Sequence, residues 1–380
     1  MNIDLKQIPS PCYVIEERLL RKNLELINKV QKEAGVKIIL ALKGFAMFST
    51  FGIVKQYLET CTASSFNEAK LCNEEMKSKA HLYSPVYLEN EFDELLKLCS
   101  HITFNSLSQW EKFKSKVFLV PQKISCGLRI NPEYSEVKTD LYNPCIAGSR
   151  LGIRAENLGN KLPGGIDGLH FHSLCENNSY TLENTLKSVE EKFGQLLKQV
   201  KWLNMGGGHL MTHKEYNVQH LIDLLKNFKN KYPNLEIILE PGGAVGWQTG
   251  YLVATVQDII DSKGIKVAML DVSFSAHTPD CLEMPYKPMI HGATDITEGK
   301  PTYRMGGITC LAGDYLGDYS FARPLKTGDK IIFDDMIHYT MVKTTTFNGV
   351  AHPSIGIWTD DSKFKLVRKF GYEDYKNRLS

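Results

Sequence analysis

The sequence predicts an α/β fold in which a (β/α)8 barrel of the TIM type is followed by a mainly β C-terminal domain. Short apolar runs alternate with longer amphipathic runs from residue 36 to residue 240, and there are eight of the apolar runs. After residue 246 the segments become β-rich. Alternating strands and helices favour a parallel sheet, and eight repeats in about 200 residues fit a closed barrel better than an open doubly wound sheet.

Each of the eight predicted strands is a short run of apolar or β-branched residues. An amphipathic stretch separates each strand from the next. The strands cover residues 36–42, 60–64, 79–85, 101–105, 123–130, 165–171, 200–205 and 235–240. The stretches at residues 90–99 and 189–200 carry apolar residues at helical spacing. We therefore assign residues 15–246 to the barrel domain.

The C-terminal part reads as a mainly antiparallel β domain over residues 247–380. Its strand-like runs lie at residues 251–260, 265–275, 329–335 and 336–347. A turn is predicted at Thr327-Gly328-Asp329, where a glycine stands between two polar residues. The segment at residues 9–17 has β character as well. We expect residues 1–14 to join the β domain as an additional strand.

The bulk composition excludes several classes of protein. The chain has 45 basic and 43 acidic residues, a balance that gives no electrostatic reason to expect nucleic acid or a membrane surface as partner. Its nine cysteines show neither CxxC pairs nor zinc-like spacing, so no metal is predicted. We find no signal peptide and no apolar run of about 20 residues. We expect reduced thiols and a cytoplasmic protein.

Polar residues of four kinds follow predicted barrel strands at their C-terminal ends. Lys43 follows the first strand, and His170 and His172 end the sixth. Three consecutive glycines, residues 206–208, follow the seventh strand, and Glu240 ends the eighth. Active sites of such barrels lie at this end of the strands, and the loops after strands seven and eight commonly bind phosphate. These residues are therefore expected to meet at one mouth.

Each of these features also has an ordinary explanation. A lysine after a strand is usually a solvated loop residue, and a pair of histidines is more often structural or metal-binding than in contact with a cofactor. Three glycines usually form a tight turn, and a glutamate can cap a helix. Their combination is more specific. An amine, a flat imidazole, a phosphate loop and a carboxylate are the groups that pyridoxal phosphate requires.

The sequence resembles the fold-type III pyridoxal-phosphate decarboxylases, the superfamily of alanine racemase and ornithine decarboxylase, over nearly its whole length. The motifs that carry the resemblance follow one another in order: "ALKGF", "TASSFNEAK", "LRINPE", "SRLGI", "HFHSLCE", "LNMGGGH", "LEPGGAVGW", "GITCLAGD" and "DDMIHYTMVKTTTFNGV". The segments "EPGGAVGWQTGYLVATV" and "FSAHTPDCLEMPYKP" are most similar to the branch that decarboxylates carboxynorspermidine and carboxyspermidine. The resemblance therefore implies a carboxy-lyase of polyamine biosynthesis.

The resemblance also implies a cofactor site, with roles carried over by position in the motifs. Lys43 is expected to bind pyridoxal phosphate covalently, His172 to stack on its ring, and Glu240 to face its ring nitrogen. The remaining expected contacts are Gly207 and Gly208 to the phosphate through backbone N–H groups, Tyr339 to the phosphate through its hydroxyl, and Arg129 as a stiffening residue.

Two further groups are implied in the C-terminal domain. Cys310 is expected to return a proton to the substrate α-carbon, and with Asp314 to reach the site of a second subunit, which implies a homodimer. The ammonium groups of a carboxylated polyamine favour carboxylates. Asp280, His277 and Glu283, together with Asp314, are the predicted substrate contacts.

Glu240 separates two chemistries within the superfamily. A carboxylate beside the ring nitrogen favours a protonated ring, which accepts electrons more readily. Alanine racemases are known for an arginine at this place, so Glu240 favours decarboxylation over racemisation. The chain departs from its relatives at Gly243, where other decarboxylases have an arginine, at Thr62, where many have aspartate, and at Cys175, where ornithine decarboxylases have serine. Phosphate and substrate contacts are expected to differ accordingly.

Other functions remain open from the sequence. Diaminopimelate, ornithine, lysine and arginine decarboxylases share the fold. An inactive regulatory homologue need not keep Lys43, His172, Glu240 and Cys310. A metal-dependent barrel hydrolase could use His170 and His172, but it needs further ligands at other strand ends, and we see no convincing set.

Overall fold

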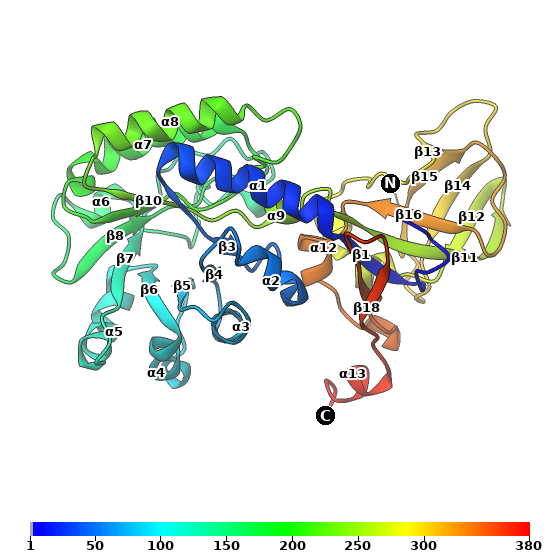
Figure 1. Ribbon diagram of the computed structural model, residues 1–380, viewed down its shortest axis with the longest axis horizontal. Coiled ribbons are helices and arrows are strands. Elements are labelled where there is room, and N and C mark those ends of the chain that lie inside the picture. Colours follow the sequence, from blue (N-terminus) through cyan, green and yellow to red (C-terminus); the bar gives the residue numbers. More distant parts are fainter. Residues whose placement is uncertain (1–2) are drawn as a thin grey trace. The chain divides into compact units, whose positions relative to one another are not determined.

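The computed structural model describes residues 3–380, and the chain divides into two compact units. One unit, the barrel unit, comprises residues 23–245. The other, the β unit, combines the segment up to residue 22 with residues 246–380. The first boundary falls within helix α1 (Glu17–Ala34), and the second falls within the short helix α9 (Gly243–Gly246). Figure 1 traces both units along the chain.

The barrel unit contains one parallel sheet whose first strand is interrupted. That strand consists of β2 (Lys37–Ile38) and β3 (Leu40–Ala41). The others, in chain order, are β4 (Cys61–Ala63), β5 (Ala80–Tyr83), β6 (Cys99–Phe104), β7 (Ser125–Arg129), β8 (Ile166–His170), β9 (Trp202–Asn204) and β10 (Glu236–Leu239). Consecutive strands are neighbours in the sheet, whose order runs from β2 through β10 back to β4 and β3.

The two pieces of the first strand close the sheet into a barrel. β2 pairs with the last strand, β10, whereas β3 pairs with β4. The backbone N–H of Ala41 donates to the carbonyl oxygen of Pro241 at 2.9 Å, and that of the next residue, Leu42, donates to Thr62 at 3.2 Å. Successive residues thus bond to strands on opposite sides, as a closed barrel requires. The predicted eight-stranded barrel is confirmed.

Helices follow the strands in the predicted alternation. They are α2 (Phe51–Val54), α3 (Phe66–Leu71) with a π-helical turn at Cys72–Met76, α4 (Glu89–Leu98), α5 (Leu107–Leu119), α6 (Ala155–Leu158), α7 (Ser179–Leu197) and α8 (Val218–Lys231). In α7 the side chains of Leu182, Leu186, Val189 and Phe193 are buried. Their three- and four-residue spacing forms one apolar face. Burying each such side chain contributes about 1.5–3 kcal/mol to stability.

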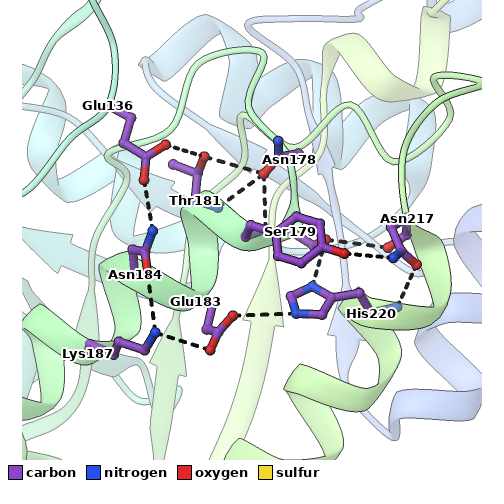
Figure 2. Close-up of polar contacts among 10 residues, drawn as sticks. Glu136, Asn178, Ser179, Thr181, Glu183, Asn184, Lys187, Asn217 and His220 are labelled. Atoms are coloured by element: carbon purple, nitrogen blue, oxygen red, sulfur yellow. Dashed lines mark hydrogen bonds and ion pairs between the residues drawn. The ribbon is translucent and has the colours of Figure 1, made fainter.

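A polar network fixes the beginnings of α7 and α8 next to each other (Figure 2). Asn178 caps α7 by accepting the backbone N–H of Tyr180 at 3.0 Å. Across the helix pair, Asn217 donates to the Tyr180 hydroxyl at 2.9 Å, and His220 Nδ1 lies 2.9 Å from the hydroxyl of Ser179. These helices begin after the loops that follow β8 and β9. The network therefore restrains the loops that carry His172 and the three glycines.

The β unit is built on one mixed sheet. Its strands are β1 (Cys12–Glu16), β11 (Gly250–Ser262), β12 (Ile265–Leu270), β13 (Ala293–Thr294), β14 (Thr302–Gly306), β15 (Tyr315–Phe321), β16 (Lys330–Asp334), β17 (Ser354–Trp358) and β18 (Phe364–Arg368). The N-terminal strand β1 pairs antiparallel with β11 and parallel with β17. β12 and β14 also pair in parallel, whereas the other pairs are antiparallel.

Short helices lie in the connections of the β unit. They are α10 (Phe274–His277), α11 (Pro279–Glu283), α12 (Tyr339–Val342) and α13 (Tyr372–Lys376). The loops around α10 to α12, and the loop between β14 and β15, carry all the predicted residues of this unit. Within residues 3–380, no helix is both long enough and apolar enough to cross a membrane.

Candidate active site

Lys43 and His172 meet at the mouth of the barrel. Lys43 follows β3, and His172 follows β8. The Lys43 Nζ lies 3.0 Å from the Nε2 of His172, and the backbone N–H of Gly207 donates to the Nδ1 of His172 at 3.1 Å. One imidazole thus connects the lysine to the glycine loop after β9.

The bond from Gly207 determines which group donates to which. A neutral imidazole whose Nδ1 accepts a hydrogen bond carries its proton on Nε2. His172 is neutral because burial holds its pKa well below the usual value. Its Nε2–H therefore donates, and the Lys43 amine accepts. Only an uncharged amine has a lone pair for this bond.

The environment of Lys43 agrees with an uncharged amine. Burial lowers the pKa of Lys43, and the charge of Arg129 lowers it further, whereas Glu240 and Glu68 act in the opposite direction. A neutral lysine amine is the form that attacks an aldehyde. The contact geometry and the direction of the pKa shift thus point to the same reactive form.

Arg129 supports this site from the end of β7. Its Nη2 donates to the carbonyl oxygen of His172 at 3.0 Å, and its guanidinium lies 4.7 Å from the centre of the Tyr83 ring. The Arg129 side chain is buried. A planar group held between a ring and a carbonyl fixes the backbone that carries the imidazole.

Glu240 is a buried carboxylate with fixed partners. Asn204 at the end of β9 donates to its Oε1 at 2.6 Å, and the Nε2 of His170 lies 3.7 Å from its Oε2. Burial raises the pKa of Glu240, while hydrogen bonds from Asn204 and Thr62 lower it. The carboxylate is therefore oriented by neutral donors rather than by a salt bridge with a permanent cation.

The glycine loop, residues 206–208, has no room for side chains. A Cβ at Gly207 would lie 2.1 Å from the carbonyl oxygen of Glu240, and one at Gly208 would lie 2.0 Å from that of Leu174. Gly208 also has a φ of +85°, which disfavours other residues. Close packing of three chain segments thus requires glycine here.

The structure revises the part expected of Gly207. Its N–H donates to His172, so it orients the imidazole and is not free to contact a phosphate. The N–H of Gly208 donates to no group among residues 3–380, and its carbonyl oxygen accepts from Asn177 at 2.9 Å. Of the two predicted phosphate donors, Gly208 alone keeps that possibility.

Two polar residues of the site were missed by the sequence reasoning. Asn204 lies in the "LNMGGGH" motif and orients Glu240. Glu68 lies in "TASSFNEAK", where its Oε2 accepts the backbone N–H of Ser64 at 2.6 Å. Burial raises the pKa of Glu68, and the hydrogen bond from the Ser64 backbone opposes that shift. Both residues stand inside motifs quoted for the resemblance, which is the signal that could have identified them.

The other predicted residues belong to the β unit, where Asp280 is the best placed for a ligand. Asp280 is 7% exposed, and its Oδ2 accepts from the hydroxyls of Thr340 at 2.7 Å and Tyr286 at 3.2 Å. Its Oδ1 has no hydrogen-bond partner among the described residues. A buried carboxylate oxygen without a donor costs about 1–3 kcal/mol, so a cationic ligand group would be stabilised there.

His277 and Glu283 are engaged differently from the expectation. His277 is fully buried, its Nδ1 accepts the backbone N–H of Ser273 at 3.1 Å, and burial lowers its pKa to about 4. Glu283 is exposed and forms an ion pair with Lys343. His277 is therefore a structural residue of this loop. A substrate amine would have to compete with Lys343 for Glu283.

Asp314 anchors the loop that carries Cys310. The backbone N–H groups of Phe274 and Ser275 donate to its Oδ1 at 2.7 and 3.0 Å, and the N–H and hydroxyl of Thr309 donate to its Oδ2 at 3.1 and 2.5 Å. With its carboxylate buried and saturated, Asp314 holds its own chain and is not available to a substrate amine. Cys310 itself is exposed.

Tyr339 begins helix α12 and is partly buried. The preceding residue, His338, lies 3.1 Å from the carboxylate of Asp335 and stacks on Trp247 with ring centres 6.0 Å apart. These contacts fix the start of α12. The aromatic face of Trp247 towards His338 is thus already used within the β unit.

The two barrel histidines do not form part of a metal site in the described chain. Among residues 3–380, no three His, Cys, Asp or Glu side chains are grouped so that they could hold a metal ion. His172 is bonded to Gly207 and Lys43, and burial holds the pKa of His170 well below its usual value. Both imidazoles are therefore neutral parts of the barrel mouth.

These residues fit pyridoxal phosphate. An uncharged amine can bind its aldehyde, a flat imidazole lies beside that amine, and a largely buried carboxylate is available for the ring nitrogen. In the glycine loop, the backbone N–H of Gly208 has no partner among residues 3–380 and can donate to a phosphate. A closed (β/α)8 barrel with this set of residues, joined to a β unit, defines the class of fold-type III pyridoxal-phosphate enzymes.

Comparison with known proteins identifies the family within this class. Residues 12–337 match the family described as "Pyridoxal-dependent decarboxylase, C-terminal sheet domain". The chain is 51% identical to carboxyaminopropylagmatine decarboxylase of Synechocystis sp., covering 100% of this chain and 97% of that protein. It is 47% identical to carboxynorspermidine/carboxyspermidine decarboxylase of Campylobacter jejuni, covering 98% and 99%.

A solved structure agrees with these relatives. The crystal structure of carboxynorspermidine decarboxylase from Campylobacter jejuni, complexed with norspermidine, matches with a TM-score of 0.91 at 46% identity and covers 98% of this chain and 100% of that one. The chain belongs to the pyridoxal-dependent decarboxylases. It is a lyase whose cofactor is pyridoxal phosphate.

Proposed function

We propose that the protein removes CO2 from the α-carbon of a carboxylated triamine, carboxynorspermidine or carboxyspermidine, to give norspermidine or spermidine. The uncharged Lys43, fixed by His172 and Gly207, carries the proposal for the chemistry. The Campylobacter jejuni relatives support the proposal for the substrate. Polyamine biosynthesis is the process that this reaction would serve.

Pyridoxal phosphate supplies an aldehyde for a primary amine and a ring that accepts an electron pair. The chain's residues do the rest in this proposal. Lys43 would hold the cofactor through its aldehyde until a substrate amine takes its place. Glu240, which Asn204 orients, would stabilise a proton at the ring nitrogen. Arg129 and Gly207 fix the orientation of the His172 imidazole, which would lie against the cofactor ring. Cys310 returns a proton to the α-carbon after CO2 has left.

A homodimer is part of the proposal because Cys310 is expected to act in the site of a second subunit. Exposed apolar side chains lie near Cys310 in the sequence, namely Ile308, Leu311 and Tyr315, and Phe347 is exposed next to Asn348, which bonds Cys310. Such side chains favour burial against another protein surface. The nine cysteines are all free, which agrees with a cytoplasmic location.

A second substrate has a specific observation in its favour. The relative with 51% identity is named carboxyaminopropylagmatine decarboxylase, and its substrate would carry a guanidinium where the triamines carry an ammonium. A planar guanidinium and a compact ammonium donate in different geometries to an accepting carboxylate. The two substrates can therefore be separated by measuring kcat/KM for each.

The proposed function is tested by assaying CO2 release from carboxynorspermidine, carboxyspermidine, carboxyaminopropylagmatine and diaminopimelate. We expect kcat/KM for a carboxylated polyamine to exceed that for diaminopimelate by at least about a hundredfold, because buried polar groups reject a ligand that leaves them unpaired. The two triamines differ by one methylene and should differ by about 10- to 200-fold at most. Greatest activity on diaminopimelate would refute the proposal.

Asp280 is predicted to bind a distal ammonium of the substrate. The substitution Asp280→Asn keeps the shape of the side chain and removes its charge. We expect KM to rise about 10- to 150-fold, since a hydrogen bond to a charged group contributes about 1.5–3 kcal/mol, with the cofactor absorbance unchanged. Glu298→Ala, which removes an exposed carboxylate of the same unit, is the control. An unchanged KM would remove Asp280 from the substrate site.

A further inference from the structure

Cys310 lies in a loop that is anchored at its base, restrained at Thr309 by Asp314, and held at Cys310 itself by Asn348. The loop, residues 307–314, connects β14 to β15. At its base, the N–H of Gly307 donates to the carbonyl oxygen of Asp314 at 2.7 Å, and that of Ile308 donates to Val272 at 2.9 Å. The side chains at the tip are exposed. The base is therefore rigid while the tip depends on few contacts.

The contact at the tip comes from Asn348. Its side-chain oxygen accepts the backbone N–H of Cys310 at 2.8 Å. The Cys310 thiol forms no hydrogen bond among residues 3–380. Because the thiol has no hydrogen bond of its own, its direction depends on the backbone of Cys310. The side-chain oxygen of Asn348 holds that backbone at its N–H.

Asn348 stands in a backbone conformation that few residues adopt readily. Its φ is +56° and its ψ is +14°, in the left-handed region, and the next residue, Gly349, has a φ of +73°. Asparagine is among the non-glycine residues that best tolerate this region. An exposed hydrogen bond adds only about 0.5–1.5 kcal/mol to stability. Geometry, rather than stability, is the stronger reason to place an asparagine here.

The C-terminal segment holds the turn that contains Asn348. Arg378 donates from Nε to the hydroxyl of the buried Thr346 at 3.0 Å. A Cβ on Gly349 would meet the ring of Tyr375 at 3.4 Å, so helix α13 packs against the turn. Asn348 is thus itself supported from the far end of the chain, as a positioning group must be.

We propose that Asn348 is a positioning residue which, through the backbone N–H of Cys310, sets the direction of the Cys310 thiol. The inference rests on the proposed function, in which that thiol returns a proton to the substrate α-carbon. A displaced thiol delivers the proton less often to this carbon. Without that delivery, hydrolysis by water would give an aldehyde in place of the amine product, and the substrate nitrogen would be retained by the cofactor.

Three substitutions separate the amide oxygen from the backbone conformation. Asn348→Gly keeps the left-handed turn and removes the acceptor, Asn348→Asp keeps both, and Asn348→Ala loses both. Lys263→Gly is the matched control, because Lys263 is an exposed residue of the same unit with a φ of +53° in the turn between β11 and β12. Thermal unfolding of each holoenzyme checks that the variants fold.

For Asn348→Gly we expect kcat to fall about 10- to 100-fold with KM nearly constant, because displacement of a reacting group by about 1 Å has effects of this size. The aldehyde fraction of the product should rise. Iodoacetamide should alkylate Cys310 of this variant at least about threefold faster than Cys310 of the wild type, since the tip loses its restraint. Peptide mass spectrometry measures the rate of this alkylation. Asn348→Asp should restore kcat to within about threefold of the wild type.

Cys310→Ala distinguishes failure of this inference from failure of the proposed function. If Cys310→Ala raises the aldehyde fraction and Asn348→Gly does not, the positioning role is wrong and the role of Cys310 stands. If Cys310→Ala leaves the amine product and kcat unchanged, Cys310 is not the proton donor, and the inference fails with it. Equal effects of Asn348→Asp and Asn348→Gly would also overturn the positioning role.

Discussion

Replacing Lys43 by alanine is expected to abolish both covalent cofactor binding and decarboxylation. The uncharged amine that accepts from His172 is the nucleophile that the cofactor aldehyde requires. We expect kcat to fall by at least about a thousandfold, as is typical when a covalent nucleophile is removed. The purified variant should lack the absorbance at about 420 nm that is typical of this cofactor when it is bound to lysine.

The control for this prediction is Lys55→Ala, which removes an exposed lysine that follows helix α2 of the same unit. Borohydride reduction and peptide mapping of the wild-type protein give an independent reading. The cofactor mass should be found on the peptide that contains Lys43. A reduced adduct on another lysine, or on none, would contradict the site.

A mixture of two inactive variants tests the shared dimer site as well. If Cys310 serves the site of the second subunit, Lys43→Ala and Cys310→Ala subunits combine into dimers with one intact site. Random association in equal amounts makes about half of the dimers mixed, so about one quarter of the wild-type activity should return. No recovery would mean that Lys43 and Cys310 act within one subunit or that subunits do not exchange.

The barrel was predictable because each strand is a short apolar run followed by a helix with a 3.6-residue apolar period. Parallel strands then place their C-terminal ends together, so Lys43, His172 and Glu240 could be grouped without knowledge of their contacts. The interruption of the first strand at Ile39 could not be predicted. It arises from closure, since residues on the two sides of this point bond to different neighbouring strands.

Hydrogen-bond partners account for most of what the sequence did not reveal. Gly207 belongs to a motif that usually contacts phosphate, but its N–H points to His172. Asp314 carries a charge suited to an amine, but five donors of its own chain occupy it. Asn204 looks unremarkable in a strand, yet it orients Glu240. Such pairings depend on tertiary geometry, which residue type and spacing do not determine.

Glu240→Gln is the substitution with the second-largest expected effect. Glutamine keeps the size of the side chain and an oxygen to accept from Asn204, but it cannot stabilise a positive ring nitrogen. We expect kcat to fall about 100- to 1000-fold, the range found when one electrostatic contact to developing charge is removed, while the cofactor stays bound. Glu240→Asp should recover part of the loss because it keeps the charge.

Glu240→Gln should lower kcat without lowering the Tm. Burial raises the pKa of Glu240, which means that the folded protein disfavours its charged form there. Removing the charge should therefore leave the Tm unchanged or raise it slightly, so a loss of kcat cannot be ascribed to unfolding. Glu236→Gln is the matched control, since Glu236 is the exposed glutamate at the start of the same strand, β10. A kcat within about threefold of the wild type in Glu240→Gln would show that the carboxylate does not act on the ring nitrogen.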